Sequence, residues 1–396
     1  MKDKTQDMLF NGILFFLYCY FIRIFNFPNE LIVVLGAILC LLIVVQQKKI
    51  KIDIGICLLT STMLSYYLIV YGLRGLTFSI VYIPMVIYIL AKYMTVYVQG
   101  SNKKYIALLF SMIIGYSLHG ILNSVMFYAG FRVPGERRWL DVWTQEWMLG
   151  THHAVFFLPV MALFIPAILF FKKRKWANGI AIIVSVFFLY TSLATRSRTP
   201  VLAFAIVVFV QLLLYVILEW KTIQNKISDR RIWIMAGVMC TGAVIALYFI
   251  KDMEVVETFI KGLSKGGGII NNVRFVAQRK ALEQLFVYPM GGYQMDLGRS
   301  LCHNTWLDMA NAAGLIPFFL FVAYTIFSLF NLTCYVFKKE ISLEKKLVMS
   351  GIYTAFFMFF TVEPALEASI HYITPWVFAN AMVHEELCDM KKKKGE

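Results

Sequence analysis

The stretch from Pro200 to Leu218, PVLAFAIVVFVQLLLYVIL, decides the fold class, because it runs for nineteen residues without a charged side chain. About 20 consecutive apolar residues cross the hydrocarbon core of a bilayer as an α-helix. The rest of the chain has the same character: 60% of its 396 residues are hydrophobic and 15% are charged, against about 25% charged residues in a soluble protein. A soluble enzyme, a secreted disulfide scaffold and a disordered protein are therefore excluded.

Apolar stretches of similar length predict an all-α polytopic membrane protein with about twelve transmembrane helices in a single membrane domain, residues 1–396. No cleavage site of small residues follows the first stretch, so we expect a retained helix and not a signal peptide. The helices are expected near residues 8–28, 31–46, 54–73, 76–94, 105–128, 151–171, 178–195, 200–219, 232–250, 311–337, 347–363 and 371–386.

The placement of basic residues predicts that both termini are cytoplasmic. Most of the 38 lysine and arginine residues lie at the termini and in alternate loops, from Lys2 to the tail Lys391 to Lys394, and such a bias marks the cytoplasmic side. The formal net charge of +15 is then explained by topology and by contact with anionic membrane lipids. We expect no nucleic acid partner.

Arginine is concentrated in the parts of the chain that this topology places outside. Arginine has a planar fork of donors that suits bidentate binding of phosphate and carboxylate, so we expect an anionic ligand at the outer face. The alternative is that these arginines anchor helices at the interface, which we favour for Arg23, Arg74 and Arg299 taken singly. The outer arginines are Arg23, Arg74, Arg132, Arg137, Arg138, Arg196, Arg198, Arg274, Arg279 and Arg299.

Three outer segments are candidates for the site. In the loop 129–150, Trp139, Trp143 and Trp147 recur every four residues, which predicts three indoles on one side of a short helix, as an interfacial belt or a surface for sugar rings. The turn 196–200 reads Arg-Ser-Arg-Thr-Pro. Thr199 and Pro200 are typical of an N-cap and a first helical residue, so the helix N-terminus and Arg198 together predict an anion site.

The third segment is the large late outer loop, 251–310. Glycines at 262 and 266–268 indicate a hinge or flap. Apolar spacing from Val273 to Phe286 predicts a helix that carries Arg274 and Arg279 and ends before Pro289. This helix is either part of the site or a surface helix resting on lipid headgroups.

No metal and no cofactor are expected. The cysteines show no CxxC and no metal-type spacing with histidine. There is no Asp-x-Asp sequence, and the nearest approach is Asp252-Met253-Glu254.

The run from Arg274 through Pro289 and Gly291 to His303-Asn304, followed after nine residues by Gly314, resembles the O-antigen ligase and polymerase family of bacterial membrane glycosyltransferases. The sequence Arg196-Ser197-Arg198 before an apolar helix looks like the other signature of that family. Ligases carry Gly, Thr or Tyr where this chain has Pro317, a departure that weakens a ligase assignment more than membership of the family.

The resemblance implies transfer of a glycan from an undecaprenyl pyrophosphate carrier to an acceptor hydroxyl, at the outer face of the bacterial cytoplasmic membrane. His303 is the expected base, since an imidazole titrates near neutral pH. Arginines would stabilise the departing pyrophosphate. The expected pyrophosphate ligands are Arg196, Arg198, Arg274 and Arg279, and the expected residues of the acceptor groove are Asn304, Arg137, Arg138, His152 and Glu363.

Three functions stay open. A polymerase uses another lipid-linked repeat unit as acceptor, whereas a ligase uses the lipid A core; the short stretch between Pro289 and His303 favours the polymerase by analogy. A polysaccharide-lipid flippase or exporter is the alternative of another class, but it predicts ionisable residues near mid-membrane. For a polymerase, the resemblance also implies a chain-length regulator and a flippase as protein partners.

Overall fold

The computed structural model describes residues 2–24, 29–47, 52–74, 78–98, 101–133, 138–195, 197–220 and 273–394. The predicted helix near 232–250, the glycine hinge and the Asp252-Met253-Glu254 sequence lie outside the described residues. So do Arg137 and Arg196, and Arg198 is described by its backbone alone.

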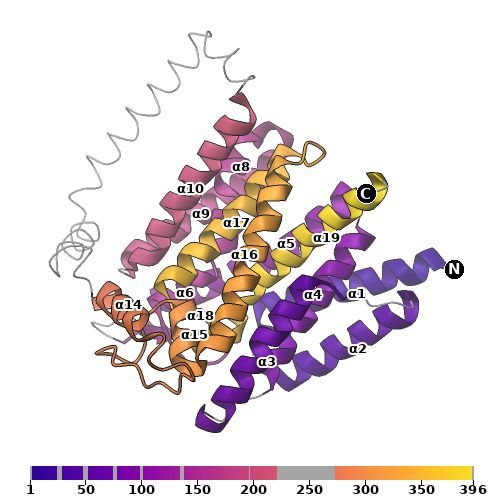
Figure 1. Ribbon diagram of the computed structural model, residues 1–396. Helices are drawn as coiled ribbons and strands as arrows, with labels where there is room; N and C mark the ends of the chain where they lie inside the picture. Colours follow the sequence, from indigo (N-terminus) through magenta and orange to yellow (C-terminus); the bar gives the residue numbers. More distant parts are fainter. Residues whose placement is uncertain are drawn as a thin grey trace.

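The described chain is mostly helical (Figure 1). Two short 3-10 helices, Phe171–Lys173 and Ile370–Tyr372, supplement the α-helices. The α-helices are α1 Lys2–Ile22, α2 Asn29–Gln47, α3 Ile54–Arg74, α4 Ser79–Tyr97, α5 Asn102–Tyr128, α6 Gly150–Val155, α7 Leu158–Met161, α8 Phe164–Leu169, α9 Lys175–Ala194, α10 Arg198–Leu218, α14 Val273–Gln284, α15 Thr305–Ala313, α16 Leu315–Phe337, α17 Leu343–Val362, α18 Ala365–Ala368 and α19 Thr374–Lys394.

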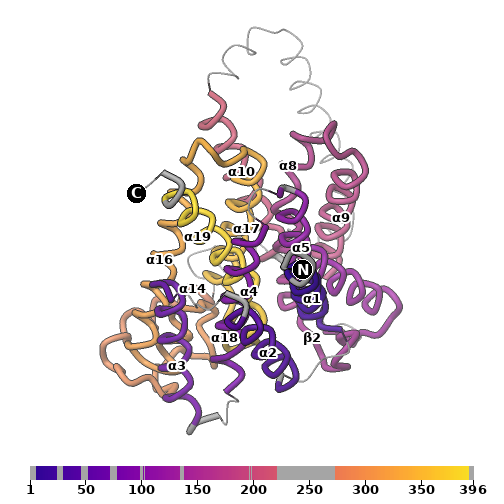
Figure 2. The backbone as a smooth tube through the Cα atoms, turned by 90° about the vertical axis from the view of Figure 1, so that its right-hand side faces the viewer, coloured from indigo at the N-terminus to yellow at the C-terminus, as the bar shows by residue number. Residues whose placement is uncertain are grey.

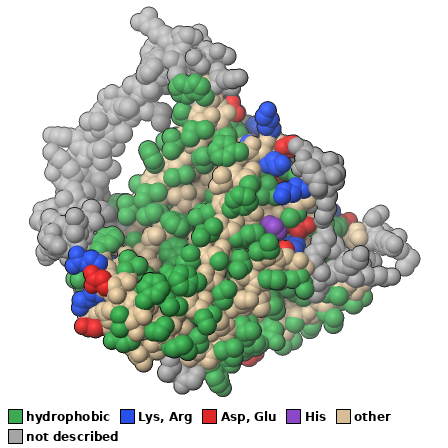
Figure 3. Space-filling view, in the orientation of Figure 1, with side chains coloured by type: hydrophobic (Ala, Val, Ile, Leu, Met, Phe, Trp, Pro, Cys, Tyr) green, Lys and Arg blue, Asp and Glu red, His purple; other side chains and the backbone are tan. Residues whose placement is uncertain are grey.

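Among the described residues, seven helices are long and apolar enough to cross a membrane, namely α3, α4, α5, α9, α10, α16 and α17. The sides of these helices that face away from the bundle carry large apolar side chains. Phe209 is 65% exposed, and Ile183 is 68% exposed. Figure 3 shows hydrophobic side chains over the middle of one face, with basic side chains near α14 at the lower left and toward the upper right. Such surface suits lipid. The count of twelve helices stays a prediction.

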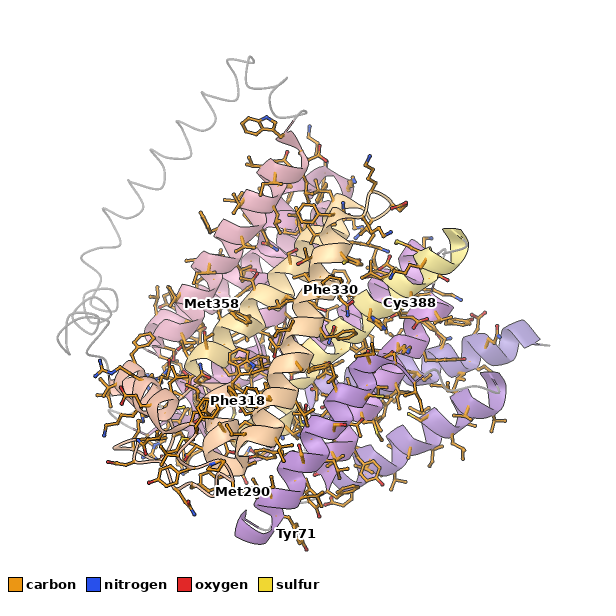
Figure 4. All side chains as sticks on the ribbon, in the orientation of Figure 1. Tyr71, Met290, Phe318, Phe330, Met358 and Cys388 are labelled. Carbon is orange, nitrogen blue, oxygen red and sulfur yellow. The ribbon has the colours of Figure 1, made fainter. Side chains whose placement is uncertain are left out.

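The two ends of the bundle differ in what they bring together. At one end, the N-terminal segment meets α5 through the ion pair of Asp7 with Lys104 (2.7 Å), and the C-terminal helix meets α4 through Lys92 and Glu385 (3.8 Å). We call this the terminal end. At the other, the site end, α14, α15, α18 and α6 gather (Figure 1), and α14 and α18 both lie in the lower half of Figure 2. In Figure 4, Cys388 lies toward the terminal end and Met290 at the site end. Both termini thus lie on one side, and their cytoplasmic placement stays a prediction.

The single helix predicted near residues 151–171 is wrong, because this segment folds as the short helices α6, α7 and α8. Pro166 has no N–H to donate to the carbonyl of Ala162, four residues earlier. Gln211 of α10 supplies the missing donor: its Nε2 lies 2.7 Å from Ala162 O and 2.8 Å from Leu347 O of α17. A Cβ at position 351 would lie 2.3 Å from that nitrogen, so Gly351 makes room for it.

The helix predicted in the loop 129–150 is also wrong. Strand β1, Arg138–Leu140, pairs antiparallel with strand β2, Trp147–Leu149, and Trp139 lies opposite Met148. Successive residues of a strand point to opposite faces, so the four-residue spacing of the tryptophans does not align them. Trp139 is fully buried, whereas Trp147 is 53% exposed.

Replacing Gln211 by leucine tests whether its side chain stabilises the segment of short helices α6, α7 and α8. The carbonyls of Ala162 and Leu347 lose their side-chain donor, so we expect the free energy of unfolding to fall by about 1–3 kcal/mol. The control is Thr333→Val, since the Thr333 hydroxyl is exposed and bonds to Leu329 O of its own helix (2.9 Å); its cost should stay below about 0.5 kcal/mol. Denaturant unfolding of the purified protein in micelles measures both. Equal losses in the two variants would contradict this account.

Candidate active site

Glu363 joins four elements at the site end. It directly follows α17, and its side chain is 2% exposed. One carboxylate oxygen, Oε1, lies 2.7 Å from Nη1 of Arg274 in α14 and accepts the hydroxyl of Thr199 in α10 at 3.1 Å. The other, Oε2, lies 3.4 Å from Nδ1 of His303, just before α15. Burial raises the pKa of Glu363, but the hydrogen bond of His303 and the charge of Arg274 outweigh it, so the pKa lies below its ordinary value.

Arg274 lies in the first turn of α14 and faces the C-terminal end of α17. Its Nη1 also donates to the carbonyl of Val362 at 2.8 Å, one of the last carbonyls of a helix, which carry partial negative charge. The side chain is 30% exposed. A guanidinium has five donors, so one side of Arg274 holds Glu363 while another side reaches the surface.

His303 has a strained backbone that its neighbours hold in place. Its φ is +58°, a value uncommon for a residue with a Cβ. The carboxylate of Asp308 accepts the N–H of Cys302 at 2.7 Å and that of Asn304 at 2.9 Å, on either side of the histidine. Gln278 of α14 donates to the carbonyl of His303 at 3.1 Å. Strain of this kind persists where surrounding contacts determine the conformation, and it gathers at functional sites.

The imidazole of His303 lies between an acceptor and a donor. Its Nε2 is in contact with a guanidinium nitrogen of Arg299, which can only donate. Nε2 is therefore the acceptor, and Nδ1 carries the proton that points to Glu363. A carboxylate that binds one imidazole nitrogen and leaves the other as an acceptor is the arrangement by which histidine is oriented as a base.

The two ends of α15 explain the spacing of the histidine motif, which is His303-Asn304 followed after nine residues by Gly314. Asn304 is the N-cap, and its side chain accepts the N–H of Leu307 at 3.1 Å. Gly314 ends the helix with φ +79° and ψ −165°, a conformation essentially confined to glycine. The next N–H, that of Leu315, bonds the carbonyl of Pro289 at 2.9 Å. Pro317 falls in the first turn of α16, where proline is tolerated.

The predicted N-cap at Thr199 is wrong. Helix α10 begins at Arg198, and Ser197 occupies the N-cap position. Thr199 is therefore inside the first turn, where its hydroxyl binds Glu363. The N-terminus of α10, which carries partial positive charge, consequently adjoins the cluster.

The other predicted site residues are placed as follows. His152 in α6 lies with its ring 5.6 Å from that of Tyr372, and burial lowers its pKa, while the charge of Glu363 opposes and that of His303 adds to this effect. Arg138 is exposed on β1. Arg279 is 73% exposed and pairs with Glu283 at 3.7 Å. The structure thus brings together Arg274, His303, Asn304 and Glu363, with His152 in electrostatic reach, whereas Arg279 pairs with Glu283 of its own helix.

Arg299 and two tyrosines at the site end are not predicted by the sequence. Arg299 was expected to be an anchor, yet it contacts His303. Glu367 of α18 accepts the hydroxyls of Tyr293, at 3.0 Å, and of Tyr66 in α3. Arg299 precedes His303 by four positions in the sequence, and this proximity is the one available signal. Tyr66 lies in an apolar stretch and Tyr293 in a glycine-containing loop, and neither position indicates a functional role.

Among the described residues, no group of three histidine, cysteine or acidic side chains is placed to hold a metal ion. The absence of a metal stays a prediction, because Asp252 and Glu254 lie outside those residues. Cys302 is buried, and burial together with the nearby Asp308 raises the pKa of its thiol far above the ordinary value, which makes it a poor nucleophile.

Gly314→Ala tests whether the histidine motif needs a glycine at the end of α15. A Cβ there would lie 2.2 Å from the carbonyl oxygen of Pro289, besides the strain of φ +79°. In the matched control, Gly292→Ala, φ is +75° but the nearest atom, in Gln294, is 3.8 Å away. We expect the control to lose about 1–3 kcal/mol of unfolding free energy and Gly314→Ala to lose clearly more, measured by denaturant unfolding. A smaller loss for Gly314→Ala than for the control would refute the explanation.

Comparison with known proteins assigns no family. No protein-family model matches the chain, and no curated protein matches it either. The similarity of the motifs to O-antigen ligases and polymerases stays a resemblance.

Proposed function

We propose that this chain is a membrane glycosyltransferase that polymerises lipid-linked oligosaccharide repeat units of an O-antigen, capsule or exopolysaccharide. It would transfer the growing glycan from undecaprenyl pyrophosphate to a sugar hydroxyl at the outer face of the bacterial cytoplasmic membrane. The observation that carries the proposal is the contact of His303 with buried Glu363, which Arg274 also binds.

In the proposed reaction, His303 is the base. The acceptor hydroxyl gives its proton to Nε2 as its oxygen forms the new bond to the anomeric carbon. Glu363 keeps the Nδ1 proton in place and stabilises the imidazolium that forms. Nε2 now contacts Arg299, so Arg299 must move aside when the acceptor binds.

The bond between the anomeric carbon and pyrophosphate breaks with its electron pair on the pyrophosphate oxygen. Arg274, Arg299 and the N-terminus of α10 would stabilise that charge. Nε of Arg299 is buried and has no hydrogen-bond partner among the described residues, so donor capacity is left for an anionic oxygen. Arg198 and Arg196, next to Thr199 in the sequence, are proposed to extend this anion site.

The acceptor groove is proposed to lie beside Asn304 and His152. The proposed reaction uses no metal, because guanidinium groups adjoin the base and supply positive charge where the leaving group would develop negative charge. The expected partners are the two lipid-linked glycans and the surrounding lipid.

A transfer assay tests the function. Purified protein in lipid discs is incubated with a synthetic undecaprenyl pyrophosphate repeat unit in the presence of a chelator, and the products are resolved by size. We expect a ladder of longer lipid-linked chains. Transfer that requires lipid A core would make the protein a ligase, and no transfer to either acceptor would refute the proposal and favour a flippase or exporter.

His303→Asn tests the base within the same assay. We expect the rate to fall by about 10²–10⁴-fold, the usual contribution of a general base, with unchanged unfolding free energy within about 1 kcal/mol. The matched control is His384→Asn, since His384 lies in α19 near Asp53 (3.6 Å) at the terminal end, and its rate should match the wild type. A wild-type rate for a folded His303→Asn protein would eliminate His303 as the base.

A further inference from the structure

A cavity of about 400 Å³ opens at the terminal end of the bundle, between α5, α8, α9 and the start of α17. It lies far from the site, because α17 has its first turn at the cavity and ends beside Glu363. A 20-residue helix is about 30 Å long. The volume is within the usual range of pockets for small ligands, about 300–1,000 Å³.

The floor of the cavity is apolar and comes from four helices. Leu109 of α5, Ala167 of α8, Ala181 of α9 and Val348 of α17 line it, and all four are buried, with 2–7% of their surface exposed. Ala177, one turn before Ala181 on α9, also lines the cavity and is exposed, so the cavity opens beside it. An apolar chain could therefore enter from the hydrocarbon region of the bilayer.

The rim of the cavity is polar and mainly basic. Lys173, Arg174 and Lys345 line it together with Glu340 and Glu344. The acidic residues leave a positive excess, since the two segments that form the rim, 171–175 and 338–346, contain eight basic residues and two acidic ones. Basic pockets between transmembrane helices are typical binding sites for anionic lipid headgroups.

The basic residues of the rim differ in what they contact. Arg174 pairs with Glu344 at 3.3 Å, and Lys345 pairs with Glu386 at 2.7 Å. Lys173 is exposed, and its ammonium group lies 4.8 Å above the ring of Phe170. Lys173 is therefore the rim residue best placed to meet an incoming phosphate without first breaking an ion pair.

We propose that this cavity binds one anionic phospholipid, with an acyl chain along the floor and the headgroup phosphate at Lys173. Charge complementarity at the rim, joined to an apolar floor that opens beside Ala177 of α9, selects a lipid over a free anion or an uncharged amphiphile. The inference is independent of the proposed function, because no residue of the cavity belongs to the site.

Titration of delipidated protein with phosphatidylglycerol, followed by native mass spectrometry, tests the proposal. We expect one saturable site. Lys173→Gln should weaken binding about fivefold, because this is the usual contribution of one basic residue to the affinity for an anionic lipid. Ala177→Trp should abolish binding, because Ala177 is exposed and lines the cavity, so an indole there fills the mouth without entering the core.

Matched controls separate the cavity from general surface effects. Lys280→Gln removes a basic residue of α14 at the site end, and Ile180→Trp places an indole on α9 outside the lining of the cavity. Both controls should bind phosphatidylglycerol as the wild type does. Phosphatidylcholine should bind at least about fivefold more weakly, and millimolar inorganic phosphate should not compete. Equal binding of phosphatidylcholine, competition by phosphate, or unchanged binding by the Ala177→Trp protein would each overturn the proposal.

Discussion

The ion pair of Arg274 with Glu363 is the interaction on which the site end depends. A carboxylate that is 2% exposed is very costly unless it is paired and hydrogen-bonded. Here α10, α14 and the segment before α15 each supply one partner to Glu363. The backbone of Glu363 is also hydrogen-bonded, since the hydroxyl of Thr305 donates to Glu363 O at 2.8 Å. One buried charge thereby positions the histidine, the arginine and the start of α10 relative to one another.

The sequence predicted the apolar helices well and the backbone between them poorly. Helices such as α10 and α16 follow from hydropathy alone, because transfer of apolar side chains into lipid decides them. The breaks between α6, α7 and α8 depend instead on a donor, Gln211, that lies on another helix. Likewise, the tryptophan spacing fits a helix, but pairing of Trp139 with Met148 makes a hairpin. Hydropathy and local spacing contain no information on such partners.

The sequence predicted several residues of the site but not the contacts between them. His303 and Asn304 stood out as a motif, and Arg274 as an arginine on an outer helix, but Glu363 is sixty residues away from His303 in the chain. Asn304 caps the N-terminus of α15, and Gly314 ends that helix. The length of α15 therefore explains why nine residues separate Asn304 from Gly314. Arg299 carries one signal in the sequence, its position four residues before His303, whereas the contact of Thr199 with Glu363 could be recognised only from the packing.

A double-mutant cycle on Arg274 and Glu363 tests the central claim most directly. The free energy of unfolding is measured for the wild type, Arg274→Met, Glu363→Gln and the double variant. Because Arg274→Met leaves a buried carboxylate short of its cation, we expect the double variant to be more stable than the sum of the single losses predicts, by about 1–3 kcal/mol. Losses that add within about 0.5 kcal/mol would show that the two residues do not depend on each other and would contradict the account.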